Sequence, residues 1–119
     1  MKKLLSVFVC FCLCVSFAMA QKDAIPAKDA GAHVGKTIWV SCDVKGFRAA
    51  REEGKPNFIN VGAAYPNHIF TVVVVGDFKE KYELDLPTLK DKTILVYGKV
   101  EVFKGVPQIK NPEKIVLQQ

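Results

Sequence analysis

The sequence predicts an all-β fold, a small closed barrel of five strands. Residues 92–109 provide the first observation, because apolar side chains recur there with the two-residue period of a β-strand, at Ile94, Val96, Val100 and Val102. The opposite side of this strand is aromatic and charged, so one face is expected to meet a core. The second observation is Gly98 inside the aliphatic row, since a glycine there marks a bulge or a sharp bend. A long bent strand followed by the turn at residues 104–107 is typical of a small barrel.

The first twenty residues are expected to be a secretory signal peptide outside the barrel. Lys2 and Lys3 precede an apolar run over residues 4–17, and an A-x-A cleavage pattern follows at residues 18–20. The apolar run is shorter than the roughly 20 residues that a membrane-spanning helix needs. We therefore expect cleavage near Ala20, one domain over residues 21–119 without a membrane span, and export to the periplasm or the medium.

The cysteines indicate that no disulfide holds this domain together. Three of the four lie in the expected signal peptide, which leaves Cys42 alone in residues 21–119. Cys42 falls on the apolar side of the first strand and is expected to be buried as a small hydrophobic side chain. Without Lys2 and Lys3, 15 of the 17 basic residues remain against 12 acidic ones, a formal charge of +3 in place of +5. This mild excess is compatible with polyanionic ligands.

The segment before the first strand predicts a short helix. Residues 21–36 have Pro26 near their start and Gly35 at their end, which fits a helix that covers one end of the barrel. The first strand begins at Thr37 and alternates over residues 37–47. Residues 46–57 are polar and rich in charge, so we expect an exposed, mobile loop.

The remaining strands follow in order along the chain. The second and third are expected at residues 58–61 and 68–75, separated by a turn that contains Tyr65 and Pro66. Residues 78–91 predict a short helix or an irregular plug, and the fourth strand is expected at residues 92–103. The fifth strand follows the turn, and residues 115–117 are expected to complete it beyond a bulge. Five strands with a connecting segment between the third and fourth is the layout of an OB-fold.

Several segments of the chain resemble a known group of proteins. They are residues 35–38, 58–62, 65–67, 70–72, 98–100 and 104–109. Together they resemble small exported bacterial OB-fold domains of the nucleic-acid-binding type, which are similar to anticodon-binding and single-strand-binding OB domains. The resemblance covers nearly all of residues 21–119 and implies oligonucleotide binding.

The candidate ligand contacts follow from the way OB-folds bind. Ligands lie on the face of strands two and three, between two bordering loops, and are held by aromatic stacking and positive charge. Phe58 and Phe70 lie on apolar strands and are expected in the core instead. The lysines have the alternative role of keeping strand edges soluble. Seven residues are predicted to contact the ligand: Arg48, Arg51, Tyr65, Tyr97, Lys99, Phe103 and Lys104.

The sequence predicts binding without catalysis. His33 and His68 are the only histidines, Cys42 lacks an evident base, and no metal-ligand or phosphate-cradling spacing occurs, so no catalytic residue, cofactor or metal is expected. The expected ligand is single-stranded nucleic acid or another oligomeric anion. The alternative is an envelope module that binds a protein or a glycan. The sequence leaves the oligomeric state open.

Overall fold

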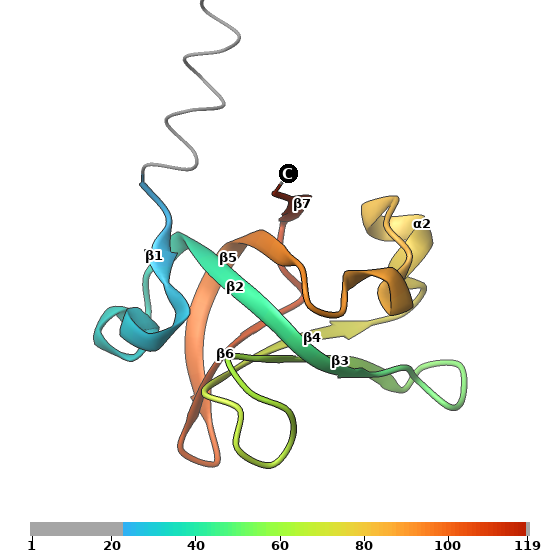
Figure 1. Cartoon of the computed structure of the whole chain (residues 1–119), viewed down its shortest axis with the longest axis horizontal. Helices are drawn as coiled ribbons and strands as arrows, with labels where there is room; N and C mark the ends of the chain where they lie inside the picture. Colours follow the sequence, from blue (N-terminus) through green and yellow to red (C-terminus); the bar gives the residue numbers. More distant parts are fainter. Residues whose placement is uncertain (1–22, 119) are drawn as a thin grey trace, which may run out of the picture.

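Five strands close into a barrel in the computed structural model, which describes residues 23–118 (Figure 1). The ring runs in the order β2, β3, β4, β6 and β5, and β5 pairs with β2 to close it. Every pair is antiparallel except β4 with β6, which is the strand arrangement of an OB-fold. The predicted fold is therefore confirmed, whereas the expected signal peptide lies outside the described residues. The strands are β2 (Thr37–Arg48), β3 (Pro56–Val61), β4 (Phe70–Val75), β5 (Thr93–Phe103) and β6 (Val106–Lys110).

The core is made of the side chains that these strands point inward at every second position. The expected burial of Cys42 and Phe70 is confirmed, because both are 0% exposed. Within residues 23–118, the buried members of the core lie between Ala27 and Ile115. Its members on the strands include Val40, Val44, Ile59, Val61, Val72, Val74, Ile94, Val96, Val100 and Ile109.

Short helices cover both ends of the barrel. The 3-10 helix η1 (Ala27–His33) contacts β2, β4, β5 and β6 and buries Ala30 completely. The other end is covered by α2 (Phe78–Tyr82) and η2 (Leu86–Leu89), the two pieces of the expected plug. η1 lies within residues 21–36, where the sequence predicted a helix, but it is a 3-10 helix and is shorter than that segment. No helix within residues 23–118 is long and apolar enough to cross a membrane.

Two further strands lengthen the sheet. β1 (Ile25–Pro26), which the sequence did not predict, pairs parallel with β2. β7 (Lys114–Leu117) pairs antiparallel with the first half of β5, and β6 pairs with the second half. Val100 of β5 pairs with Ile109 of β6, and Tyr97 of β5 pairs with Lys114 of β7. Between these two pairs, the segment that links β6 to β7 has more residues than the facing part of β5. The extra residues form the bulge expected before residues 115–117, but these residues belong to the separate strand β7 and do not complete the fifth strand, β6, as predicted.

Gly98 makes room for this bulge. A Cβ atom at Gly98 would lie 2.5 Å from Cγ2 of Ile109 and 3.3 Å from Cα of Pro112. The glycine therefore allows the bulged chain to approach the backbone of β5 closely. The sequence predicted a bulge or a sharp bend at Gly98, and the bulge lies on the facing chain between β6 and β7.

Candidate functional site

The outer face of β3, β4 and β6 carries side chains in rows across the sheet. Core residues such as Ile59, Val72 and Ile109 point inward, so the residues beside them in the sequence point outward. Strand register then determines which outward side chains are neighbours. One row, named here the cation–aromatic row, consists of Arg48, Phe58, Val73 and Lys110. The polar row, about 7 Å away along the strands, consists of Asn60, Thr71, Gln108 and Glu101.

Arg48 and Phe58 form a cation–π contact on this face. The guanidinium carbon of Arg48 lies 4.9 Å from the centroid of the Phe58 ring. Arg48 is exposed and Phe58 is half-buried, so both can be reached from solvent. The prediction that Phe58 lies in the core is wrong, because its neighbour Ile59 occupies the inward position on β3. The alternation of Phe58, Ile59, Asn60 and Val61 contained this signal, since it groups Phe58 with a polar residue.

In the polar row the first two side chains are short, and Gln108 and Glu101 at its end are hydrogen-bonded to each other. Asn60 and Thr71 are only 9% and 7% exposed. Nε2 of Gln108 donates a hydrogen bond to Oε1 of Glu101 at 3.1 Å. This bond leaves the carbonyl oxygen of Gln108 and the second carboxylate oxygen of Glu101 as acceptors for a ligand. The sequence analysis missed this row, because its members come together only through the register of separate strands.

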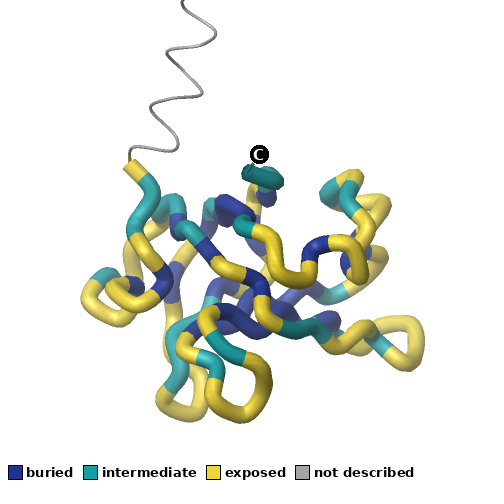
Figure 2. Tube along the Cα trace, viewed as in Figure 1, coloured by how far each residue is buried: buried dark blue, intermediate teal, exposed yellow. Residues whose placement is uncertain are grey.

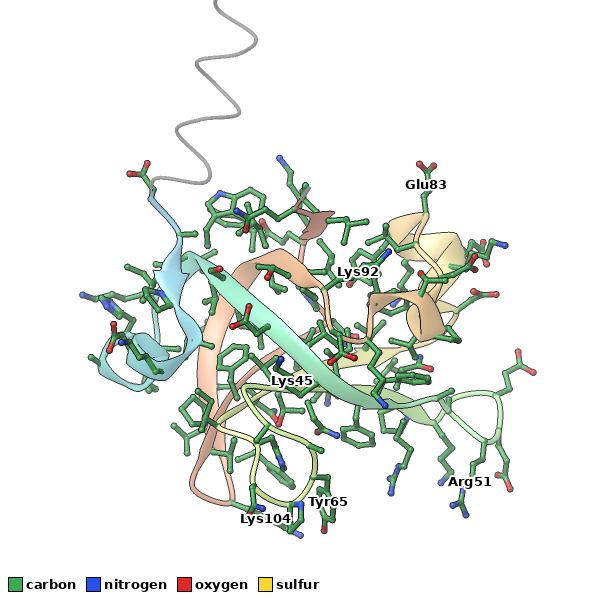
Figure 3. The ribbon with its side chains drawn as sticks, viewed as in Figure 1. Lys45, Arg51, Tyr65, Glu83, Lys92 and Lys104 are labelled. Carbon is green, nitrogen blue, oxygen red and sulfur yellow. The ribbon has the colours of Figure 1, made fainter. Side chains whose placement is uncertain are left out.

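A cavity of about 280 Å³ opens beside the cation–aromatic row, where β2 leads into loop 49–55. Its walls include Arg48, Arg51 and Lys55, together with the acidic Glu52. The one ion pair among residues 23–118 joins Lys79 to Asp85, so no carboxylate lies within 4.0 Å of these three cations. Figure 3 shows Arg51 projecting from the loop at the edge of the molecule. Three cations around one cavity suit the binding of phosphate.

Asn57 anchors this loop, although the sequence predicted the loop to be mobile. Oδ1 of Asn57 accepts a hydrogen bond from the amide of Ala50 at 2.9 Å. Nδ2 donates to the carbonyl oxygens of Val74 at 3.0 Å and Gly76 at 2.9 Å. The bond to Val74 is buried and the other two are partly buried, and together they fix the start of the loop against the end of β4.

Phe103 and Lys104 lie at the hairpin that joins β5 to β6. Phe103 pairs with Val106 and is 58% exposed, and Nζ of Lys104 lies 5.4 Å from its ring centroid. Phe103 follows Glu101 by two residues on β5, so it extends the outer face beyond the polar row. The hairpin therefore adds a second pairing of an aromatic ring with a cation.

The other three predicted contacts lie elsewhere. Tyr97 packs against Trp39 of β2 with ring centroids 5.2 Å apart, and Lys99 pairs with Thr37, both where β2 meets β5. Tyr65 is 76% exposed in loop 62–69 and stacks on His68, with ring centroids 5.6 Å apart. Figure 3 shows Tyr65 and Lys104 toward the lower end of the view, away from Arg51. The seven predicted residues are therefore spread over the barrel and do not form one cluster.

Cys42 is unsuited to nucleophilic chemistry. It is 0% exposed, and its Sγ donates to the carbonyl oxygen of Val40 at 3.7 Å. Burial, and secondly the carboxylate of Asp43, raise the pKa of the thiol far above its ordinary value. In the part of the chain that the structure describes, no three His, Cys, Asp or Glu residues are grouped so that they could hold a metal ion.

Comparison with solved structures supports the assignment of the fold. The chain is similar to a protein assigned as an aspartyl-tRNA synthetase from Leishmania major Friedlin, with a TM-score of 0.55 and 15% identity, covering 79% of this chain and 20% of that one. It is also similar to asparaginyl-tRNA synthetase from Pyrococcus horikoshii, with a TM-score of 0.53 and 17% identity, covering 81% of this chain and 23% of that one. At these identities the likeness shows the OB-fold alone. No protein-family profile and no curated protein sequence matches the chain.

Proposed function

We propose that this protein is a non-catalytic module that binds single-stranded nucleic acid on the outer face of β3, β4 and β6. The observation that carries the proposal is the contact of Arg48 with Phe58 beside a cavity lined by three cations. An aromatic ring offers a stacking surface to any base, and nearby cations neutralise phosphates. The two solved structures described above are, by their names, aminoacyl-tRNA synthetases, which supports nucleic acid over other oligomeric anions.

In the proposed complex one base stacks on the guanidinium of Arg48, which lies over the Phe58 ring, and the phosphate of that nucleotide enters the cavity beside loop 49–55. Arg48 serves both contacts, because its guanidinium lies over the ring and also lines the cavity. The polar row lies about 7 Å farther along the strands and presents hydrogen-bonding groups to the edge of a second base. Phe103 and Lys104 stand beyond that row and would stack and neutralise a third nucleotide.

The proposal is tested by titrating residues 21–119 into labelled single-stranded DNA and RNA and following fluorescence anisotropy. Binding is expected to saturate and to weaken steeply with salt, because phosphate contacts release counterions. Replacing Arg48 and Phe58 together by Ala is expected to weaken binding by about 1–3 kcal/mol for the lost stacking, in addition to the lost phosphate contact.

The matched control replaces Tyr97 and Lys99 by Ala, which removes an aromatic ring and a cation from where β2 meets β5. This variant is expected to bind like the unchanged protein. If it loses affinity while the Arg48 and Phe58 variant does not, the binding site lies at Tyr97 and Lys99 instead. Absence of binding to DNA and RNA at every salt concentration would contradict the proposal and favour a protein or glycan ligand.

A further inference from the structure

All the exposed large apolar side chains within residues 23–118 lie in three segments. Tyr65 and Ile69 belong to loop 62–69, and Val102 and Phe103 belong to the hairpin between β5 and β6. Val34 directly precedes Gly35, whose amide donates to the carbonyl oxygen of Val100. Their exposed fractions run from 44% to 76%. Single exposed apolar residues are ordinary on a protein surface, so their spacing decides whether they matter.

Strand register places the three segments at the same end of the barrel. β4 and β6 run parallel and Thr71 pairs with Gln108, so loop 62–69 and the hairpin lead into neighbouring strands at the same end. Figure 2 shows both turns exposed at the bottom of the view. The ladder bonds of Gly35 and Lys36 with Val100 bring Val34 to this end as well. This surface, formed by Val34, Tyr65, Ile69, Val102 and Phe103, is named here the hairpin end.

Exposed cations lie beside the apolar side chains of the hairpin end. The exposed cations Lys36 and Lys104 accompany the hairpin end, where Glu101 already accepts a hydrogen bond from Gln108. The opposite end, around α2, carries the acidic residues Asp77, Glu80, Glu83 and Asp85 together with Lys79 and Lys81. At the hairpin end the exposed cations lie next to the exposed apolar side chains, so this end can attract an anionic partner.

We propose that the hairpin end docks on the surface of an anionic lipid bilayer. Apolar side chains at the tips of two turns can enter the boundary between headgroups and acyl chains, and a tyrosine suits that boundary because its hydroxyl stays in the headgroup layer. Lysines next to them add attraction to anionic headgroups. The aliphatic residues Val34, Ile69 and Val102 offer no stacking surface to a base, so they lie outside the proposed nucleic-acid site, which shares Phe103 and Lys104 with this surface.

The test is co-sedimentation of residues 21–119 with vesicles made of equal parts phosphatidylglycerol and phosphatidylcholine, and with vesicles of phosphatidylcholine alone. The first twenty residues are omitted because their apolar run would itself enter lipid. The protein is expected to sediment with the anionic vesicles and to bind the neutral ones weakly. Replacing Val34, Tyr65 and Val102 together by Ser is expected to lower the lipid-bound fraction about tenfold or more. Replacing Lys36 and Lys104 by Ala is expected to remove the preference for anionic lipid.

Two further measurements separate this proposal from its competitors. The variant with Arg48 and Phe58 replaced by Ala is expected to keep lipid binding, whereas the triple Ser variant keeps nucleic-acid binding. Tyr65→Trp in a Trp39→Phe background is expected to shift its emission to shorter wavelength when anionic vesicles are added.

Equal sedimentation of the unchanged protein and the triple Ser variant, or no sedimentation at all, would overturn the proposal. So would self-association of the unchanged protein that the triple Ser variant abolishes, because the hairpin end would then bind a second copy.

Discussion

The guanidinium of Arg48 lies 4.9 Å from the ring centroid of Phe58, and the two residues are a register pair of β2 and β3. Their contact stands at the edge of the cavity that Arg51 and Lys55 help to line. Stacking and phosphate neutralisation are therefore available side by side. The rings of Trp39 and Tyr97 also pack against one another, but where β2 meets β5, and neither residue lines that cavity.

Arg48→Lys should show how much of the binding depends on the positive charge of Arg48 and how much on the planar shape of its guanidinium. The lysine keeps the positive charge, so the slope of log affinity against log salt is expected to stay the same. Affinity is nevertheless expected to fall, because an ammonium group lacks the planar surface that stacks on Phe58 and a base. Arg48→Ala, measured in parallel, is expected to reduce the salt slope by about one. An unchanged slope in Arg48→Ala would mean that Arg48 contacts no phosphate.

Asn57→Ala should loosen loop 49–55 and destabilise the barrel. The substitution removes three hydrogen bonds and leaves the carbonyl oxygen of Val74 and the amide of Ala50 without their partner. The free energy of unfolding in urea is expected to fall by about 1–3 kcal/mol, and the Ala50 amide is expected to exchange its hydrogen faster. Asn67→Ala, at an exposed position in loop 62–69, is the control and should leave the stability nearly unchanged.

The fold could be predicted because its signals are local. Two-residue alternation identified strands of the barrel, and the interruption at Gly98 predicted a bulge or a sharp bend, which the structure has on the facing chain between β6 and β7. Arg48 and Arg51, which the sequence predicted to contact the ligand, line one cavity because they lie at the end of β2 and in the loop that follows it. These features depend on residues that are close in the sequence.

The rows of the outer face could not be predicted in the same way. Thr71 and Gln108 become neighbours only through the parallel pairing of β4 with β6, which joins strands distant in the sequence. Tyr97 was grouped with Phe103 because both alternate on one side of β5, but the strand first pairs with β2 and then with β6. A long strand that serves two halves of a barrel separates residues that its period alone would group together.

Gly98→Ala should test the close approach of the bulge to β5. The new methyl group would meet Cγ2 of Ile109 at 2.5 Å and the backbone of Pro112 at 3.3 Å, so the chain between β6 and β7 must move. Such overpacking is expected to lower the free energy of unfolding by about 1–3 kcal/mol. Gly31→Ala is the matched control, because its methyl group would meet only Cγ of Pro107 at 3.5 Å, an ordinary contact. Similar urea midpoints for both variants would contradict the argument.

Burial of Cys42 should make the stability of the protein depend on alkaline pH. Burial raises the pKa of the thiol above its ordinary value of 9.0. Above that value the unfolded chain releases a proton that the folded barrel retains, so the stabilisation is complete below pH 9.0 and is lost as the pH rises. The expected loss is about 1.4 kcal/mol per pH unit while only the unfolded state is ionised.

The measurement is urea unfolding at several pH values from about 7 to about 10 in a Tyr82→Phe background. That background is needed because burial also raises the pKa of Tyr82, whose hydroxyl donates to the carbonyl oxygen of Pro112 at 2.7 Å, and its effect has the same sign. Cys42→Ala should be less stable at neutral pH, because it leaves a small cavity, but its stability should fall less steeply above pH 9.0. Equal slopes with Cys and Ala at position 42 would show that the thiol ionises in the folded barrel as readily as in the unfolded chain.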